Sequence, residues 1–85
     1  MSKKTAVVGS SVGLHARPAS VIAEAAGEYD DDILLSIDGE EPIDAASVML
    51  IMTLGAEKGT VVTVESDNEE AVEKIAALIE TDLDA

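Results

Sequence analysis

The sequence predicts an α+β domain in which three helices cover one face of a four-stranded antiparallel sheet, in the order β-α-β-β-α-β-α. The first observation is the alternation of short β-like runs with longer runs whose apolar residues recur at helical spacing. The second is the hairpin signal Asp38-Gly39 between two of the β-like runs. The third is the length of 85 residues, which allows a single domain over residues 1–85. This order of elements suits a sheet with its helices on one side.

Proline and glycine residues mark where several predicted elements begin or end. Pro18 opens the first helical run, because a proline in the first turn loses no hydrogen bond. Pro42 cannot donate to a ladder, so the return strand of the hairpin is predicted at the sheet edge. Gly55 ends a short helix that Asp44 or Ser47 caps. The predicted strands are 5–8, 33–37, 40–44 and 60–64, and the predicted helices are 18–29, 47–55 and a final helix whose inner face carries Ala71, Val72, Ile75, Ala76, Leu78 and Ile79.

The charge of the chain narrows its possible partners. It carries 18 acidic and 5 basic residues, a formal net charge of −13. This argues against nucleic acid and against anionic membrane surfaces as partners, because few cations remain to meet phosphates. Such acidity is typical of a solvated surface adapted to high salt, since the screening length is only about 3 Å at roughly 1 M. We therefore expect the fold to gain stability in concentrated salt.

The residue types exclude several kinds of site. The chain has no cysteine and one histidine, which excludes disulfides and thiolate metal sites and argues against structural zinc. No run approaches the roughly 20 apolar residues of a membrane span, and no signal peptide is visible. With neither Trp nor Phe, the core is expected to consist of Val, Ile, Leu, Met and Ala. These features predict a cytoplasmic monomer with no metal, no cofactor and no membrane insertion.

The segment Gly13-Leu14-His15-Ala16-Arg17-Pro18-Ala19 holds the sole histidine and the sole arginine of the chain. A neutral imidazole is a nucleophile, and the planar guanidinium of arginine suits phosphate oxygens. If Ala16 or Arg17 begins the helix, His15 lies at or next to the N-cap. The backbone N–H groups of Ala16 and Arg17 then favour an anionic group beside the ring. The motif predicts that a phosphoryl group is carried on His15 without a metal.

A structural interpretation of the same residues stays open at this point. A histidine near a helix start is commonly a polar surface residue or a cap, and Arg17 can be a plain solvated charge. The segment Ser47-Val48-Met49-Leu50-Ile51-Met52-Thr53-Leu54-Gly55 is more apolar than one buried helix face requires. An excess of this kind indicates either core residues or an exposed docking surface.

The segment around His15 resembles the active-site signature of HPr, the histidine-containing phosphocarrier of the phosphoenolpyruvate-dependent sugar phosphotransferase system. The segment from Ala46 to Gly55 is similar to the short-helix motif of that family, which contains a serine. The resemblance covers essentially the whole chain and implies an open-faced β-sandwich. It implies that His15 accepts a phosphoryl group on Nδ1 from enzyme I and passes it to a histidine of an enzyme IIA domain, with Arg17 steadying the phosphate. This relay leads to sugar uptake.

The resemblance also implies roles for the short helix. Met49, Leu50, Ile51 and Met52 contain the positions that match the docking helix of the family, although some of these side chains are expected to belong to the core. Ser47 matches a serine that a dedicated kinase phosphorylates in some bacterial members, while its role as a helix cap explains the residue equally well. A phosphate there would add negative charge to the docking face and impair partner binding.

Three residues depart from the family pattern, and two other functions remain open. Leu50 stands where a glycine is common, and Glu24 and Glu28 stand where neutral or basic residues are common. The acidic pair would repel acidic partners unless salt screens it or the partners are adapted. One alternative function is a regulatory module that docks to a target without supporting transport. The other is a carrier for a dihydroxyacetone kinase that uses a phosphoprotein as its donor.

Overall fold

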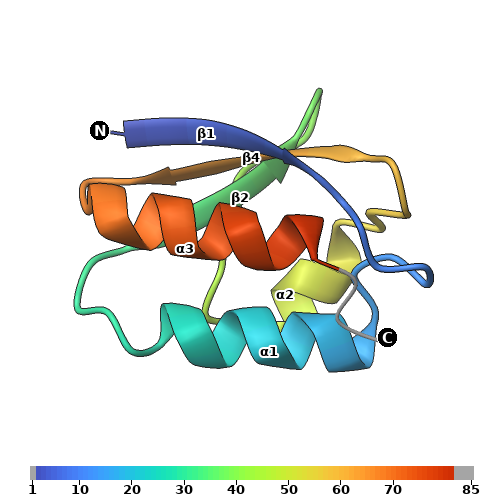
Figure 1. The fold of residues 1–85 in the computed structure, drawn as a ribbon, viewed down its shortest axis with the longest axis horizontal. Coiled ribbons are helices and arrows are strands. Elements are labelled where there is room, and N and C mark those ends of the chain that lie inside the picture. The colour runs from blue at the N-terminus through green and yellow to red at the C-terminus, as the bar shows by residue number, and fades with distance from the viewer. Residues whose placement is uncertain (1, 82–85) are drawn as a thin grey trace.

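The structure, a computed structural model, describes residues 2–81 and confirms the predicted element order. It forms a sheet with its helices on one face (Figure 1). The helical layer lies below the sheet in that view, with α3 against β1 and β4, and α1 packed on α2 and α3. The elements are β1 (Ser2–Val7), α1 (Ala16–Ala26), β2 (Ile33–Ile37), β3 (Ile43–Asp44), α2 (Val48–Thr53), β4 (Val61–Ser66) and α3 (Glu69–Glu80).

The sheet is antiparallel throughout, with the strand order β1-β4-β2-β3. The central strand β4 pairs with β1 on one side and with β2 on the other, and β3 lies at the edge as Pro42 predicted. Alternate residues of β4 point to opposite faces, so Val62 and Val64 are buried while Val61 is exposed. The face opposite the helices is uncovered, so the predicted open sandwich is confirmed.

The hairpin between β2 and β3 is less regular than the sequence suggests. The Asp38-Gly39 turn forms, with Gly39 at φ +83° and the Glu40 N–H donating to the Ile37 carbonyl over 3.0 Å. Yet the ladder pairs Leu35 with Ile43, so the return side carries one residue more than the β2 side. Residues 40–42 therefore form an irregular connection, and the predicted strand 40–44 shortens to its last two residues.

Other boundaries shift for local reasons. β1 begins at Ser2 instead of residue 5, since the backbone of Lys3 and Lys4 pairs with β4. The apolar pattern did not predict this part of the strand, because both side chains are charged. α1 begins at Ala16, one of the two starts that the motif allows, and Pro18 lies in its first turn and not at its first residue. The helix ends at Ala26, and the predicted extension to residue 29 is wrong because the chain leaves the helix after its C-cap at Gly27.

The core is aliphatic, as the composition predicts, but neither described methionine belongs to it. Met49 and Met52 are exposed on α2. Leu78 of α3, predicted on the inner face, is only partly buried against the core. The largest fully buried hydrophobic side chains come from both layers and are Ile22, Leu35, Ile51, Ile75, Ile79, Val8, Val62 and Val64.

Candidate functional site

His15 is the N-cap of α1, as the motif predicts. Its backbone is extended, with φ −80° and ψ −170°, and its carbonyl accepts the Ala19 N–H over 2.8 Å. Its side chain makes no capping hydrogen bond and is exposed. An N-cap side chain commonly satisfies an amide of the first turn. Here the imidazole is left uncommitted at the surface.

The first turn of α1 therefore offers two free donors beside His15. The backbone N–H groups of Ala16 and Arg17 meet no acceptor within residues 2–81, and Pro18 has no N–H. The exposed side chain of Arg17 starts from the same turn. Pro18 is buried, which anchors the helix start in the core. Unpaired amides and the positive end of the helix dipole favour an anion at this position.

The loop that leads to His15 is held by the segment after α2. The Leu14 N–H donates to the Ala56 carbonyl over 2.8 Å, and the Leu14 side chain is buried. Gly13 has φ +75°, a conformation that L side chains avoid. A Cβ at Gly13 would lie 2.5 Å from the Ala56 oxygen and 2.9 Å from the Glu57 Cα. Glycine is thus required both for the turn and for the close approach of the two loops.

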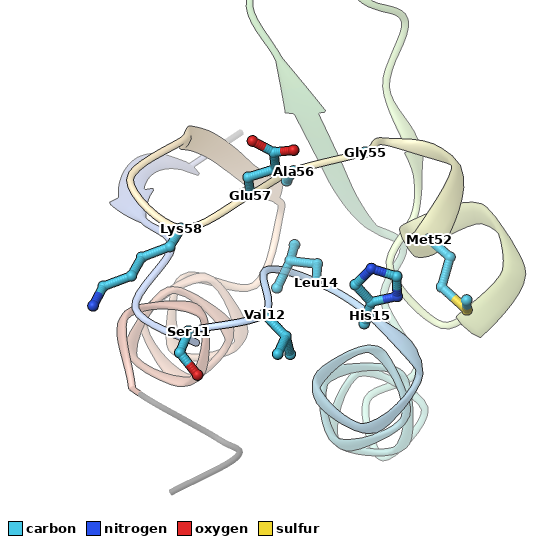
Figure 2. A pocket seen from close by; sticks show the side chains of 9 residues that line it. All are labelled: Ser11, Val12, Leu14, His15, Met52, Gly55, Ala56, Glu57 and Lys58. Carbon is cyan, nitrogen blue, oxygen red and sulfur yellow. The ribbon is translucent and has the colours of Figure 1, made fainter.

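His15 opens onto a shallow hollow of about 470 Å³ between these loops and α2 (Figure 2). Figure 2 shows the imidazole between the start of α1 and the Met52 side chain, while Lys58 extends to the opposite rim beside Ser11. The sequence pattern does not predict Lys58 at this site, because only tertiary contacts bring the residue to the hollow. Its position in the sequence gives one indication of a role, since the chain has only five basic residues and Lys58 is one of them. The lining residues are Ser11, Val12, Leu14, His15, Met52, Gly55, Ala56, Glu57 and Lys58.

The short helix α2 exposes three of the four side chains of the predicted docking surface, and one of them, Met52, lines the hollow with His15. Met49, Leu50 and Met52 are 77, 41 and 40% exposed. Ile51 does not belong to this surface, because its side chain is fully buried in the core and no partner can reach it. Ser47 is the N-cap, and its hydroxyl accepts the Leu50 N–H over 3.2 Å. We call Met49, Leu50 and Met52 the α2 patch.

Carboxylates are distributed unevenly around the site. No acidic residue occurs in residues 1–23 or 45–56, which include the His15 loop, the first half of α1 and all of α2. Glu24 and Glu28 lie further along, on the exposed side of α1 and in the turn after it. Within residues 2–81 no group of three or more His, Cys, Asp or Glu side chains is placed to hold a metal ion. The site thus lies in a part of the chain with few carboxylates, and Glu57 is the acidic residue among those that line the hollow.

Comparisons with known proteins agree with this combination of fold and site. The family model described as the PTS HPr component phosphorylation site matches residues 2–81. The phosphocarrier protein HPr of Mycoplasma capricolum is 36% identical over 84 residues, covering 99% of this chain and 93% of its own. The phosphocarrier protein NPr of Klebsiella oxytoca is 34% identical over 77 residues, covering 91% of this chain and 86% of its own.

Solved structures of the same family have the same fold as this chain. The crystal structure of HPr-C-His from Thermoanaerobacter tengcongensis superimposes with a TM-score of 0.89 at 32% identity, covering 100% of this chain and 98% of that one. An exposed histidine at the first helix start of an open-faced sandwich therefore defines a phosphocarrier of the phosphotransferase system. The chain belongs to the HPr family. In the part of the chain that the structure describes, no helix is both long and apolar enough to cross a membrane.

Proposed function

We propose that this protein is a cytoplasmic, monomeric carrier that takes a phosphoryl group from enzyme I on Nδ1 of His15 and passes it to a histidine of an enzyme IIA domain, for sugar uptake. The observation that carries the proposal is the exposed imidazole of His15, which makes no capping hydrogen bond, next to two amides that meet no acceptor within residues 2–81. The family membership of the chain supports the same chemistry.

The transfer needs little from the carrier itself. The lone pair of the His15 ring nitrogen attacks phosphorus, and a P–N bond forms as the bond to the donor breaks. The amides of Ala16 and Arg17 at the helix start, and the exposed guanidinium of Arg17, would donate to the phosphoryl oxygens. In the second transfer the His15 nitrogen is the leaving group, so the carrier returns unchanged. The carrier is thus a stoichiometric intermediate in the relay and not an enzyme.

The α2 patch provides the surface on which partners would dock. Its three side chains expose apolar area on α2, and Met52 lines the same hollow as His15, so contact with a partner there would exclude water from the transfer. Ser47 caps the same helix, so a phosphate on its hydroxyl would place added negative charge on this surface. We include phosphorylation of Ser47 as a regulatory step in the proposal.

The decisive experiment is phosphorylation by enzyme I and phosphoenolpyruvate in molar KCl, followed by mass spectrometry. Wild-type protein should gain one acid-labile phosphate, and His15→Ala should gain none. Arg17→Ala should fold normally, because the side chain is exposed, and transfer about 10- to 100-fold more slowly, the value of a charge-assisted hydrogen bond. Absence of a mass gain in wild type, or a gain that survives His15→Ala, would refute the carrier function. Incubation with a IIA domain and with a dihydroxyacetone kinase then separates the two possible acceptors.

A further inference from the structure

We propose that Met49 and Met52 form a modification site, at which reversible oxidation of the two thioethers by a peroxide weakens the docking of partners to the α2 patch. This inference deepens the proposed function and rests on it, because the oxidised side chains lie on the surface that partners would use. The effect depends on a change of polarity in this chain and on no particular charge of the partner.

All sulfur atoms of this protein are thioethers. The chain has no cysteine and three methionines, so a peroxide meets no thiol that would react in their place. Met1 lies outside the described residues. The other two methionines both belong to α2, where Met49 is 77% exposed and Met52 is 40% exposed. Both thioethers are therefore within reach of an oxidant in solution.

The position of the two thioethers links them to the His15 site. Met52 lines the hollow together with His15, and Figure 2 shows its side chain on the α2 side of the imidazole. Met49 exposes more of its surface than the other large hydrophobic side chains that are exposed within residues 2–81. Oxidation converts each apolar side chain into a polar sulfoxide, and a partner that covers the sulfoxide oxygen must remove its water. The apolar surface available for docking is thereby lost.

The fold does not depend on either thioether. Within residues 2–81 neither methionine belongs to the buried core or to the partly buried side chains packed against it. The helix α2 is held instead by the fully buried side chain of Ile51 and by the Ser47 hydroxyl, which accepts the Leu50 N–H over 3.2 Å. These supports contain no sulfur. Oxidation is therefore expected to leave the domain folded and to change only its surface.

The modification is an oxygen transfer that an enzyme reverses. The methionine Sδ attacks one oxygen of the peroxide, the O–O bond breaks and an S–O bond forms. The sulfide is oxidised to a sulfoxide while hydrogen peroxide is reduced to water. A methionine sulfoxide reductase restores the thioether, because the sulfoxide oxygen leaves as water while two thiols are oxidised to a disulfide. The α2 patch is thus switched between an apolar and a polar state.

The test measures KM for the carrier in phosphorylation by enzyme I and phosphoenolpyruvate, in molar KCl, before and after hydrogen peroxide treatment. A metal chelator is present during oxidation, and the peroxide is removed before enzyme I is added. Peptide mass spectrometry should find one added oxygen on each of Met49 and Met52, with an unchanged circular dichroism spectrum. KM should rise about 5- to 30-fold, as expected when a polar group is buried without a partner, and kcat should stay the same. Methionine sulfoxide reductases specific for the two sulfoxide epimers should restore the original KM.

Two variants provide matched controls. Met49→Leu combined with Met52→Leu removes both thioethers and keeps the surface apolar. The ratio of KM after and before oxidation is compared within each protein, so the basal activity of the variant does not enter, and this ratio should be one. Adding Val61→Met to the same variant places an exposed thioether on the uncovered face of the sheet. Its oxidation should also leave the ratio at one.

The possible failures are distinguishable. If untreated wild type is phosphorylated and its oxidised form has the same KM, or if neither Met49 nor Met52 gains oxygen, the inference is refuted and the carrier function stands. An equal rise in KM for the protein with Val61→Met, or a loss of the circular dichroism signal on oxidation, also refutes the inference, because the effect is then not confined to the α2 patch. If untreated wild type is not phosphorylated at all, the proposed function fails and this inference fails with it.

Discussion

Replacing Gly13 with alanine tests the account of how His15 is positioned. The φ of +75° costs a residue with a Cβ about 1–2 kcal/mol. The new Cβ would also lie 2.5 Å from the Ala56 oxygen, so the two loops must separate. Separation breaks the 2.8 Å hydrogen bond between the Leu14 N–H and the Ala56 carbonyl, which adds about 1–3 kcal/mol because the Leu14 region is buried. We expect Gly13→Ala to lower the free energy of unfolding by about 2–5 kcal/mol.

Gly39 provides a matched control. Its φ is +83°, so alanine there meets the same conformational strain, yet a Cβ would meet no atom within 4 Å. We expect Gly39→Ala to cost only about 1–2 kcal/mol. Urea unfolding followed by circular dichroism in molar KCl measures both variants. Equal losses of stability would refute the argument that the loops approach closely at Gly13. A normal phosphorylation rate in a well-folded Gly13→Ala protein would refute the claim that this contact positions His15.

Three further predictions concern the salt response and the α2 helix. The melting temperature should rise by several degrees between about 0.1 M and about 2 M KCl, because screening relieves the repulsion of a −13 charge, and a flat or falling curve would contradict this. Ser47→Ala should lower the free energy of unfolding, measured in urea, by about 1 kcal/mol, whereas Ser47→Asp keeps a capping oxygen and should lower it little. Equal losses in the two variants would contradict the capping role of Ser47. Ile51→Ala should lower the free energy of unfolding by about 2–5 kcal/mol, because the side chain is buried. Met49→Ala should leave the free energy of unfolding unchanged and weaken docking to enzyme I. The reverse pattern would contradict the assignment of core and surface on α2.

The sequence predicts the features that depend on neighbours along the chain. Alternating apolar residues indicate the strand Ile33–Ile37, and helical spacing indicates α1 and α3. Pro42 correctly places its strand at the edge of the sheet. The boundaries are less certain where local chemistry competes, as at Lys3 and Lys4, whose charges conceal a strand that is formed by pairing with β4.

On the short helix α2, the apolar pattern of the sequence does not predict which side chains are buried. Its four apolar residues Met49 to Met52 are indistinguishable in sequence, because any of them fits either a core or a surface. Burial depends on how α2 is rotated against α1 and β3, which no local spacing specifies. The structure turns Ile51 inward and leaves the α2 patch outward.

The sequence by itself determined the local arrangement at His15, since the histidine, Arg17 and the helix start are adjacent in the chain. It also determined that residues 1–23 and 45–56 carry no carboxylate side chain. Only the tertiary structure decided which distant residues join them. The hydrogen bond between Leu14 and Ala56 depends on the packing of both layers, and through it Lys58 arrives at the rim of the hollow. Contacts between residues far apart in the chain follow from the packing of the whole domain, so the site is completed only when the protein folds.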